Sequence, residues 1–328
     1  MLNQTPPGQT PPGSHVRPTR SRPIQIVVTP GSGDGRAMAT ALELRNALAA
    51  HRYLSSLEVF PTLGALRKWT ETPSKDFSVL LCVGGDGTQS TTALAALRRS
   101  VPFLPVSSGF GNLFAQAFGH HGRVEEVLSL LKHGRIVHSD VGTCNDELFL
   151  CQQSYGLIPE VQDAVEAAAD RPRARWQRWL AYYGAAVRHL RDAPPRRLRV
   201  LVDGRVVAVD AALVIVANVK TYGAWLPLAP NASPVDGLLD VFVMSAATHR
   251  EVIAKLLRRH LRIPGSDAGT LLCRGQRVSV SGLKWGRDQI EVLRHRLPVV
   301  VSPATAAALE RDRTWNEHQV PLVSGLMA

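Results

Sequence analysis

The chain has 328 residues, of which 45% are hydrophobic, so it is long enough to bury large cores and to form two lobes. Its formal net charge of +11 favours an anionic partner, such as nucleotide phosphates, acidic lipid headgroups or nucleic acid, without choosing among them. The sequence contains no apolar run of the ~20 residues that a membrane-spanning helix needs, and its cysteines lack the Cys-x-x-Cys spacing of a zinc site.

The first 22 residues are rich in proline, glycine and threonine and contain no apolar segment typical of a signal peptide. We expect a disordered tail over residues 1–22, because this composition cannot pack a core. The cysteine pattern favours reduced thiols and a cytoplasmic location. Any membrane contact is expected to be peripheral.

Three segments then repeat one design, an apolar strand followed by a glycine-bearing turn and the start of a helix. They cover residues 24–50, 77–97 and 101–115. Neither the G-x-G-x-x-G spacing of dinucleotide-binding folds nor the G-x-x-x-x-G-K-[ST] of P-loop proteins occurs in them. We therefore expect an α/β nucleotide-binding lobe, Rossmann-like in architecture, in which three strand ends meet at one crevice.

The second of these turns, Gly84-Gly-Asp-Gly-Thr88, is typical of a phosphate site. Its glycines lack a Cβ, so backbone N–H groups can approach a polyphosphate at the start of the following helix. Asp86 would repel phosphates unless a divalent cation or a proton transfer lies between them, which indicates Mg²⁺–nucleotide chemistry. A plain strand-to-helix turn with Asp86 as its cap is the alternative that the residues leave open.

The second half of the chain predicts a sheet-rich lobe, with a domain junction near residues 135–140. Two helices interrupt its strands. Residues 175–191 form an amphipathic cationic pattern that fits either an anionic membrane surface or packing across the sheet. The other helix begins with the capping box Thr248-His-Arg-Glu251 and is interpreted as scaffold. Expected strands cover residues 147–152, 199–202, 206–219, 239–244, 277–281 and 297–301.

Taken together, these motifs resemble the diacylglycerol kinase catalytic-domain family, which includes bacterial lipid kinases and sphingosine kinases. NAD kinases share the Gly-Gly-Asp-Gly-Thr motif, but their downstream Asn-Glu pair is absent. The resemblance rests on Thr29-Pro-Gly-Ser-Gly33, Gly84 to Thr88, Gly109-Phe-Gly-Asn-Leu-Phe-Ala115, Asn218, Tyr222-Gly223, Pro230-Asn-Ala232 and Asp236-Gly-Leu-Leu-Asp-Val241.

The resemblance implies a nucleotide-binding lobe of the NAD-kinase/diacylglycerol-kinase type over residues 23–138. A β-sandwich over residues 139–302 would hold the acceptor lipid, and residues 303–328 would return to the first lobe. ATP and Mg²⁺ would be the cofactors. The residues expected to contact or order the nucleotide and its metal are Ser32, Gly33, Thr62, Gly84, Gly85, Asp86, Gly87, Thr88, Gly109 and Asn112.

Several positions depart from the family pattern. Phe110 stands in place of a threonine and Leu113 in place of an aspartate. The family's Asp-Gly-Glu, whose glutamate is proposed to activate the lipid hydroxyl, is not intact here, and Asp288 and Glu291 are the candidate bases. The resemblance also implies a structural Mg²⁺ at Asp236, with Ser233 and Leu238, although an ordinary Asp-Gly hairpin fits those residues equally well.

The leading hypothesis is therefore an ATP-dependent lipid kinase with diacylglycerol as the first candidate acceptor, peripheral contact with an anionic membrane and a possible homodimeric state. A kinase-like protein that binds nucleotide and lipid but has weakened catalysis is the alternative. Nucleic-acid binding is disfavoured, because aromatic residues are few and do not interleave with the basic runs.

Overall fold

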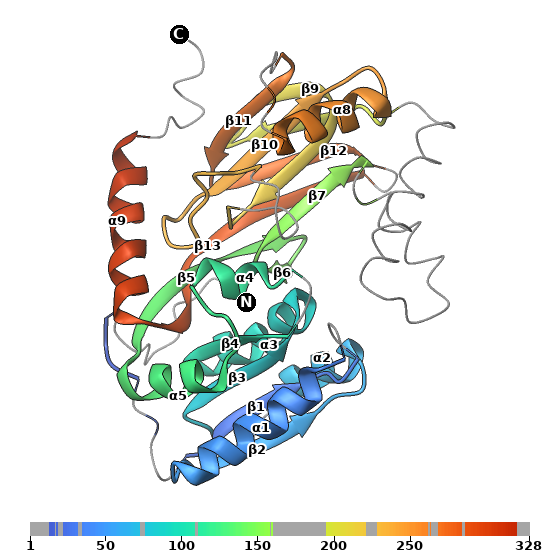
Figure 1. Cartoon of the computed structure of the whole chain (residues 1–328). Coiled ribbons are helices and arrows are strands. Elements are labelled where there is room, and N and C mark those ends of the chain that lie inside the picture. The colour runs from blue at the N-terminus through green and yellow to red at the C-terminus, as the bar shows by residue number, and fades with distance from the viewer. Residues whose placement is uncertain are drawn as a thin grey trace.

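A computed structural model describes residues 13–16, 18, 22–31, 35–72, 76–108, 111–157, 159, 195–220, 228–261, 263, 268–283 and 286–319. The strands join into one sheet that runs through two lobes (Figure 1). Its order is β11-β10-β9-β8-β12-β13-β4-β3-β1-β2, with β5 paired to β13 and β6, and β7 paired to β9. Within the part of the chain so described, no helix has the length and apolarity to cross a membrane.

The first lobe is a three-layer α/β structure. Its strands are parallel, and β1, β3 and most of β4 are buried, whereas the edge strand β2 is partly exposed. Helices cover both faces of the sheet: α1 and α5 pack on one face, and α2 and α3 on the other. The elements are β1 (Ile24–Val28), α1 (Ala37–Ala50), β2 (Ser55–Val59), α2 (Leu63–Glu71), β3 (Val79–Gly84), α3 (Asp86–Arg99), β4 (Phe103–Ser107), α4 (Leu113–Ala117) and α5 (Val124–His133).

The second lobe is built from antiparallel strands with an apolar core on each face. One core gathers side chains of β8, β9, β10 and β12, and the other gathers the alternate side chains of β9 and β10 with α8. This arrangement agrees with the predicted β-sandwich. Its elements are β5 (Arg135–Cys144), β6 (Glu147–Phe149), β7 (Gln152–Gly156), β8 (Leu198–Val202), β9 (Arg205–Ala217), β10 (Leu239–Ser245), α8 (His249–His260), β11 (Thr270–Gly275), β12 (Arg277–Leu283), β13 (Gly286–Val301) and α9 (Pro303–Gln319).

The lobes are connected by strands rather than by a linker. Where the sequence predicted a junction, residues 135–140 form the first part of β5, which pairs with β13 along most of its length. The register between β5 and β13 shifts between Leu293 and Leu297, and His295 in that interval has a φ of 48°. β13 thus pairs with β12 in the second lobe and, at Val299, with β4 in the first.

The N-terminal end of the described chain lies against this shared strand region. Residues 13–16 differ from the expected disordered tail, because they are attached to the start of β5. The Gly13 N–H donates to the Ile136 carbonyl at 2.8 Å, and the Val16 side chain is buried. Residues 13–16, within the stretch expected as a tail, are therefore attached to the sheet.

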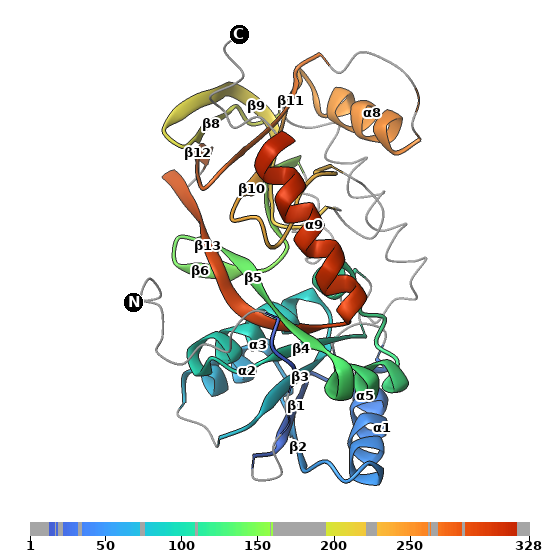
Figure 2. The same ribbon diagram turned by 90° about the vertical axis from the view of Figure 1, so that its left-hand side faces the viewer.

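The C-terminal helix α9 connects the two lobes from outside the sheet. It starts beside the first lobe and runs along β5 toward the second (Figure 2). Its Asp312 pairs with Lys220, which follows β9, at 2.9 Å. The predicted cationic helix at residues 175–191 lies outside the described residues.

Candidate functional site

The carboxyl ends of the parallel strands meet at one edge of the first lobe. Since β3 lies between β1 and β4, the turns that follow these three strands are neighbours. This is the edge at which open α/β sheets bind ligands. Four residues of interest in these turns lie outside the described part of the chain, namely Ser32, Gly33, Gly109 and Phe110.

The Gly84–Thr88 turn leads directly into α3. A Cβ on Gly84 would lie 2.6 Å from the Cβ of the buried Thr88, so glycine is needed here for strand and helix to pack closely. Gly85 is the N-cap of α3 and supplies no side-chain cap. The N–H groups of the first turn are therefore left without a side-chain cap, at the positive end of the helix dipole.

Asp86 occupies the first turn of α3, but its carboxylate reaches across to the start of α4. Its Oδ1 accepts a hydrogen bond from the Phe114 backbone N–H at 3.2 Å. Burial raises the pKa of Asp86, while hydrogen bonds from the backbone of Phe114, the thiol of Cys151 and the backbone of Leu113 and Asn112 oppose that shift. The carboxylate thus has a structural role, as a cap of α4 rather than of its own helix.

A glycine on one side and a cysteine on the other surround this carboxylate. A Cβ on Gly111 would come within 2.8 Å of Asp86 Oδ2, so the absence of a side chain at residue 111 makes room for it. On the other side, Cys151 Sγ lies 3.6 Å from Asp86 Oδ1. Cys151 belongs to the segment between β6 and β7, and the Asn218 N–H donates to its carbonyl oxygen at 2.8 Å. The second lobe therefore contributes to the setting of Asp86.

Thr62 and Asn112 are also brought to this edge. Thr62 is the N-cap of α2, where its hydroxyl accepts from the Ala65 N–H at 3.2 Å. The next residue, Leu63, has its Cδ1 3.6 Å from the place of a Cβ on Gly87, so α2 begins beside the first turn of α3. Asn112 is the N-cap of α4 with a left-handed φ of 49°. A nucleotide contact by either side chain stays a prediction.

The two candidate bases lie on β13 and face opposite sides of it, because they are three residues apart on a strand. Asp288 Oδ1 accepts from the Asn145 side chain at 2.7 Å and lies near Tyr155. Glu291 is exposed. A role of either carboxylate as the base stays a prediction.

The proposed Mg²⁺ residues lie in a buried cluster where the lobes join. Asp236 Oδ2 pairs with the Arg274 guanidinium, and both side chains are 1% exposed. Asp236 Oδ1 accepts from the Leu238 N–H at 3.0 Å. Both carboxylate oxygens are engaged, and the positive charge beside them belongs to Arg274. A structural Mg²⁺ at Asp236, Ser233 and Leu238 does not fit this arrangement.

Two further carboxylates complete the cluster. Asp240 Oδ2 lies 3.6 Å from Arg274 Nε. Asp140 accepts from the backbone N–H of Gly237 at 2.6 Å and of His295 at 2.7 Å. The pKa of Asp140 is raised to about 7, and so is that of Asp240. Burial is the main cause in both, and the negative charge of Asp236 also raises both pKa values. The cluster joins β5, β10, β11 and the kink of β13.

Sequence reasoning missed Cys151, Arg274 and Asp140. Their partners lie far away in the chain: Cys151 is 65 residues from Asp86, and Arg274 is 38 from Asp236. Asp140 lies in the stretch that was interpreted as a junction. The one available signal was its place among the β-branched residues at positions 136, 137 and 141, which favour a strand.

Comparisons with known proteins agree with this architecture. A sequence model of the diacylglycerol kinase catalytic domain matches residues 23–144, and one of the YegS C-terminal NAD kinase beta sandwich-like domain matches residues 160–282. The border between lobes that was expected at residue 138 lies inside β5. A crystal structure from Bacillus anthracis of a protein taken to be a diacylglycerol kinase superimposes with a TM-score of 0.65, at 21% identity, over 86% of this chain and 98% of that chain.

Relatives with similar sequences come from several bacteria. A diacylglycerol kinase of Bacillus subtilis is 26% identical over 56% of this chain and 60% of its own length, and one of Mycobacterium tuberculosis is 24% identical over 70% and 75%. A Synechocystis protein is 24% identical over 62% of this chain but 47% of its own length. The chain therefore spans about half of one of these relatives and three fifths of another. By its two matched domains and its fold, the chain belongs to the diacylglycerol kinase catalytic-domain family.

Proposed function

We propose that this protein is an ATP-dependent lipid kinase that transfers the γ-phosphoryl group to a lipid hydroxyl, with diacylglycerol as the first candidate acceptor. The relatives named diacylglycerol kinase support the reaction type. In this proposal the protein works in the cytoplasm and meets its lipid by peripheral contact with a membrane.

The observation that carries the proposal is the setting of Asp86. The Asp86 carboxylate is half-buried at the first turn of α3, and the N-cap of that helix supplies no side-chain cap. The carboxylate is held by backbone N–H groups at the start of α4 and by the Cys151 thiol. Uncapped N–H groups at a helix start bind phosphate oxygens, and a carboxylate next to them binds the accompanying cation. The site thus offers partners for both charges of a metal–nucleotide complex.

Each residue would act by positioning. The first turn of α3 would hold phosphate oxygens, with its glycines leaving room for them, and Asp86 would hold Mg²⁺ through the oxygen nearer to Gly111. Bound Mg²⁺ supplies neutralisation of the charge on the transferred phosphoryl group. Cys151 and Asn218 would keep the second lobe, and with it the acceptor, against the nucleotide edge. In-line transfer requires such a fixed arrangement.

The test replaces Asp86 by asparagine, because alanine would also remove the cap of α4, at a cost of roughly 1 kcal/mol. Asp86→Asn keeps an oxygen to accept from Phe114 and removes the charge. We expect transfer from γ-labelled ATP to diacylglycerol in mixed micelles to fall at least about 100-fold with an unchanged melting temperature. Glu58→Gln, which removes an exposed charge from β2 in the same lobe, should keep full activity. An Asp86→Asn protein that retains turnover would refute the proposed role.

A second candidate function is a kinase-like protein that binds nucleotide and lipid with little transfer. The replacement of a family carboxylate by an apolar residue at the start of α4 favours it. Leu113, where the family has an aspartate, is 7% exposed and packs in the core of the first lobe. Saturable binding of Mg–ATP without labelled product from any member of a lipid panel would support this function over the first.

A further inference from the structure

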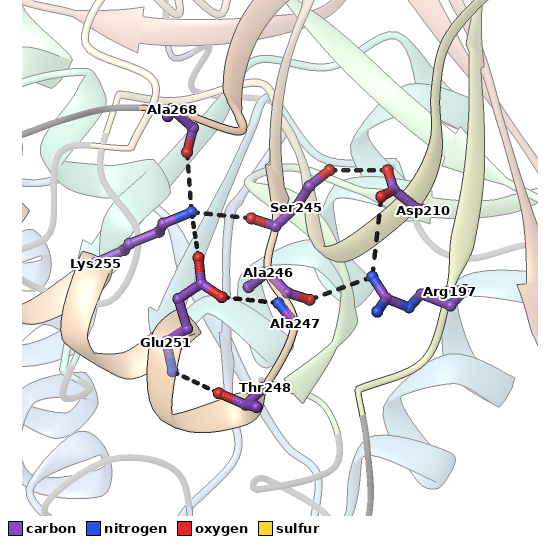
Figure 3. A network of polar contacts seen from close by, with 9 residues as sticks. All are labelled: Arg197, Asp210, Ser245, Ala246, Ala247, Thr248, Glu251, Lys255 and Ala268. Carbon is purple, nitrogen blue, oxygen red and sulfur yellow. Dashed lines mark hydrogen bonds and ion pairs between the residues drawn. The ribbon is translucent and has the colours of Figure 1, made fainter.

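Helix α8 is fixed to the second lobe mainly through its N-terminal end. Thr248 caps it by accepting from the Glu251 N–H at 3.2 Å, and Glu251 in turn accepts from the Ala247 N–H at 2.8 Å (Figure 3). Lys255 pairs with Glu251 at 2.9 Å and donates to two backbone carbonyls, one before the helix and one after it. These contacts hold the first two turns of the helix in place.

The segment before the helix is attached to β9 in the same way. The Arg197 guanidinium donates to the Ala246 carbonyl at 3.3 Å, and the Ser245 hydroxyl donates to Asp210 at 3.1 Å (Figure 3). Arg197 and Asp210 also lie 3.9 Å apart as an ion pair. The start of α8 is therefore set by polar contacts as well as by packing.

The second half of α8 leaves apolar side chains in solvent. His249 and Val252 are the buried residues of the helix, whereas Leu257 is 43% and Leu261 just after it 61% exposed. Leu257 and Leu261 are four residues apart and share a face. Ile263, beyond the helix end, is 52% exposed. An apolar ridge of Leu257, Leu261 and Ile263 thus projects from the lobe.

A cationic side chain extends the face of this ridge toward the start of the helix. Arg250 lies seven residues before Leu257, which is two helical turns, so the two side chains share one face. Arg250 is exposed, and so is Ala254 between them. The one acidic residue of the helix, Glu251, is paired with Lys255, so its negative charge is matched within the helix.

The last turn of the helix carries further basic residues. Arg258 and the exposed His260 flank the ridge. The guanidinium of Arg259 turns instead over the Phe242 ring, 5.4 Å from its centroid. The surface presented by the ridge and its borders is therefore apolar and cationic.

We propose that this ridge docks on the surface of an anionic lipid bilayer. An amphipathic helix with aliphatic residues on one side and arginines beside them binds such an interface by inserting the former and pairing the latter with headgroups. A second copy of the chain fits less well, because a two-fold contact through the ridge would bring like charges such as Arg250 together. The proposal does not depend on kinase activity. It assigns membrane contact to a helix that the sequence indicated as scaffold.

The position of α8 leaves it accessible to a bilayer. Figure 2 shows the helix at the edge of the second lobe, on the side away from the nucleotide lobe and from β8 and β12. Figure 1 places it near the top of the second lobe beside β9, with which it is in contact. A bilayer against this edge would leave the strand ends of the first lobe accessible to nucleotide.

The experiment measures co-sedimentation of the full chain, without nucleotide, with vesicles of phosphatidylcholine alone and with vesicles containing phosphatidylglycerol. We expect binding to the anionic vesicles only, weakened by salt. Leu257→Gln with Leu261→Gln should reduce the partition coefficient at least about tenfold. Arg250→Gln should reduce the same coefficient about fivefold.

The matched control is Val206→Gln with Val209→Gln on β9, where the side chains are 47% and 62% exposed without being part of the ridge. Binding of this control should equal that of the wild type. Absence of wild-type binding, equal losses in the control and the leucine variant, or a wild-type dimer in sedimentation equilibrium that the leucine variant converts to monomer would each overturn the proposal. Because no nucleotide is present, a failure here is separate from a failure to phosphorylate lipid.

Discussion

Asp86 and Asp236 have similar surroundings in sequence and different ones in the fold. Each precedes a glycine in a short turn, and each was a candidate ligand for Mg²⁺. Asp86 is half-buried and held by backbone N–H groups, whereas Asp236 is buried against the guanidinium of Arg274. A distant residue, and not the local motif, therefore decides whether a carboxylate is available to a cation.

The largest expected effect comes from breaking the Asp236 pair. In Arg274→Met, Asp236 and Asp240 would stay buried without their positive partner, so the free energy of unfolding should fall by about 3–5 kcal/mol. Urea unfolding followed by circular dichroism measures this change. Arg277→Met, at an exposed position on the next strand, should alter it by less than about 0.5 kcal/mol. Equal stabilities of the two variants would mean that the pair contributes nothing.

The pH dependence of stability sharpens the same comparison. The folded-state pKa of Asp240, raised to about 7, lies above that of the unfolded chain, so the folded protein binds more protons between about pH 4 and pH 7. The contribution of Asp240 to stability should thus grow as pH falls from 8 to 5, by on the order of 2 kcal/mol. Asp240→Asn should lose this part of the slope. Since Asp140 is present in both proteins, the difference between their curves reports Asp240. Parallel curves would contradict the assignment.

At the Asp86 site, the expected effect of a small change is on transfer rather than on folding. A methyl group in Gly111→Ala would meet Asp86 Oδ2 at 2.8 Å and displace it, so we expect about a tenfold loss of kcat for phosphoryl transfer. Gly64→Ala places its Cβ at an ordinary 3.8 Å from its nearest neighbour and is the control. Equal kcat values for the two variants would show that the carboxylate needs no fixed position.

The smallest effect is expected from chelation. Arg274 pairs with the carboxylate at which the family resemblance implied a structural Mg²⁺. EDTA should therefore change the melting temperature of the nucleotide-free protein by less than about 1 °C. The same chelator should stop phosphoryl transfer, because that proposal places Mg²⁺ with the nucleotide. Differential scanning fluorimetry and the micelle assay test the two sites in one preparation. A drop of several degrees in EDTA would restore the structural Mg²⁺.

The first lobe could be predicted from sequence because its signals are local. The apolar runs at residues 24–28 and 79–83 and the glycines after them specify strand, turn and helix within a few residues. β5 was not predicted as a strand because His138, Ser139 and Asp140 are polar, yet all three are buried. β11 was missed because, apart from its first residue, a threonine, its residues are not β-branched.

The sites themselves depend on contacts that no local pattern contains. Cys151 reaches Asp86 from the second lobe, and Arg274 reaches Asp236 from a strand that the sequence did not indicate. Such pairs are set by the pairing of β5 with β13 and of β10 with β11. Predicting them requires the tertiary arrangement, so the motif indicated the place of the site but not its electrostatics.

The sharing of β13 between the lobes bears on how the protein can be divided. A fragment ending at residue 144 would keep every strand of the kinase-type match, but it would lose the 297–301 segment that lies between β4 and β5. The edges of β4 and β5 that pair with this segment would then expose backbone N–H and C=O groups without partners. The two halves are hence matched as separate modules by their sequences, yet they share one sheet, so we expect truncation between them to give insoluble protein.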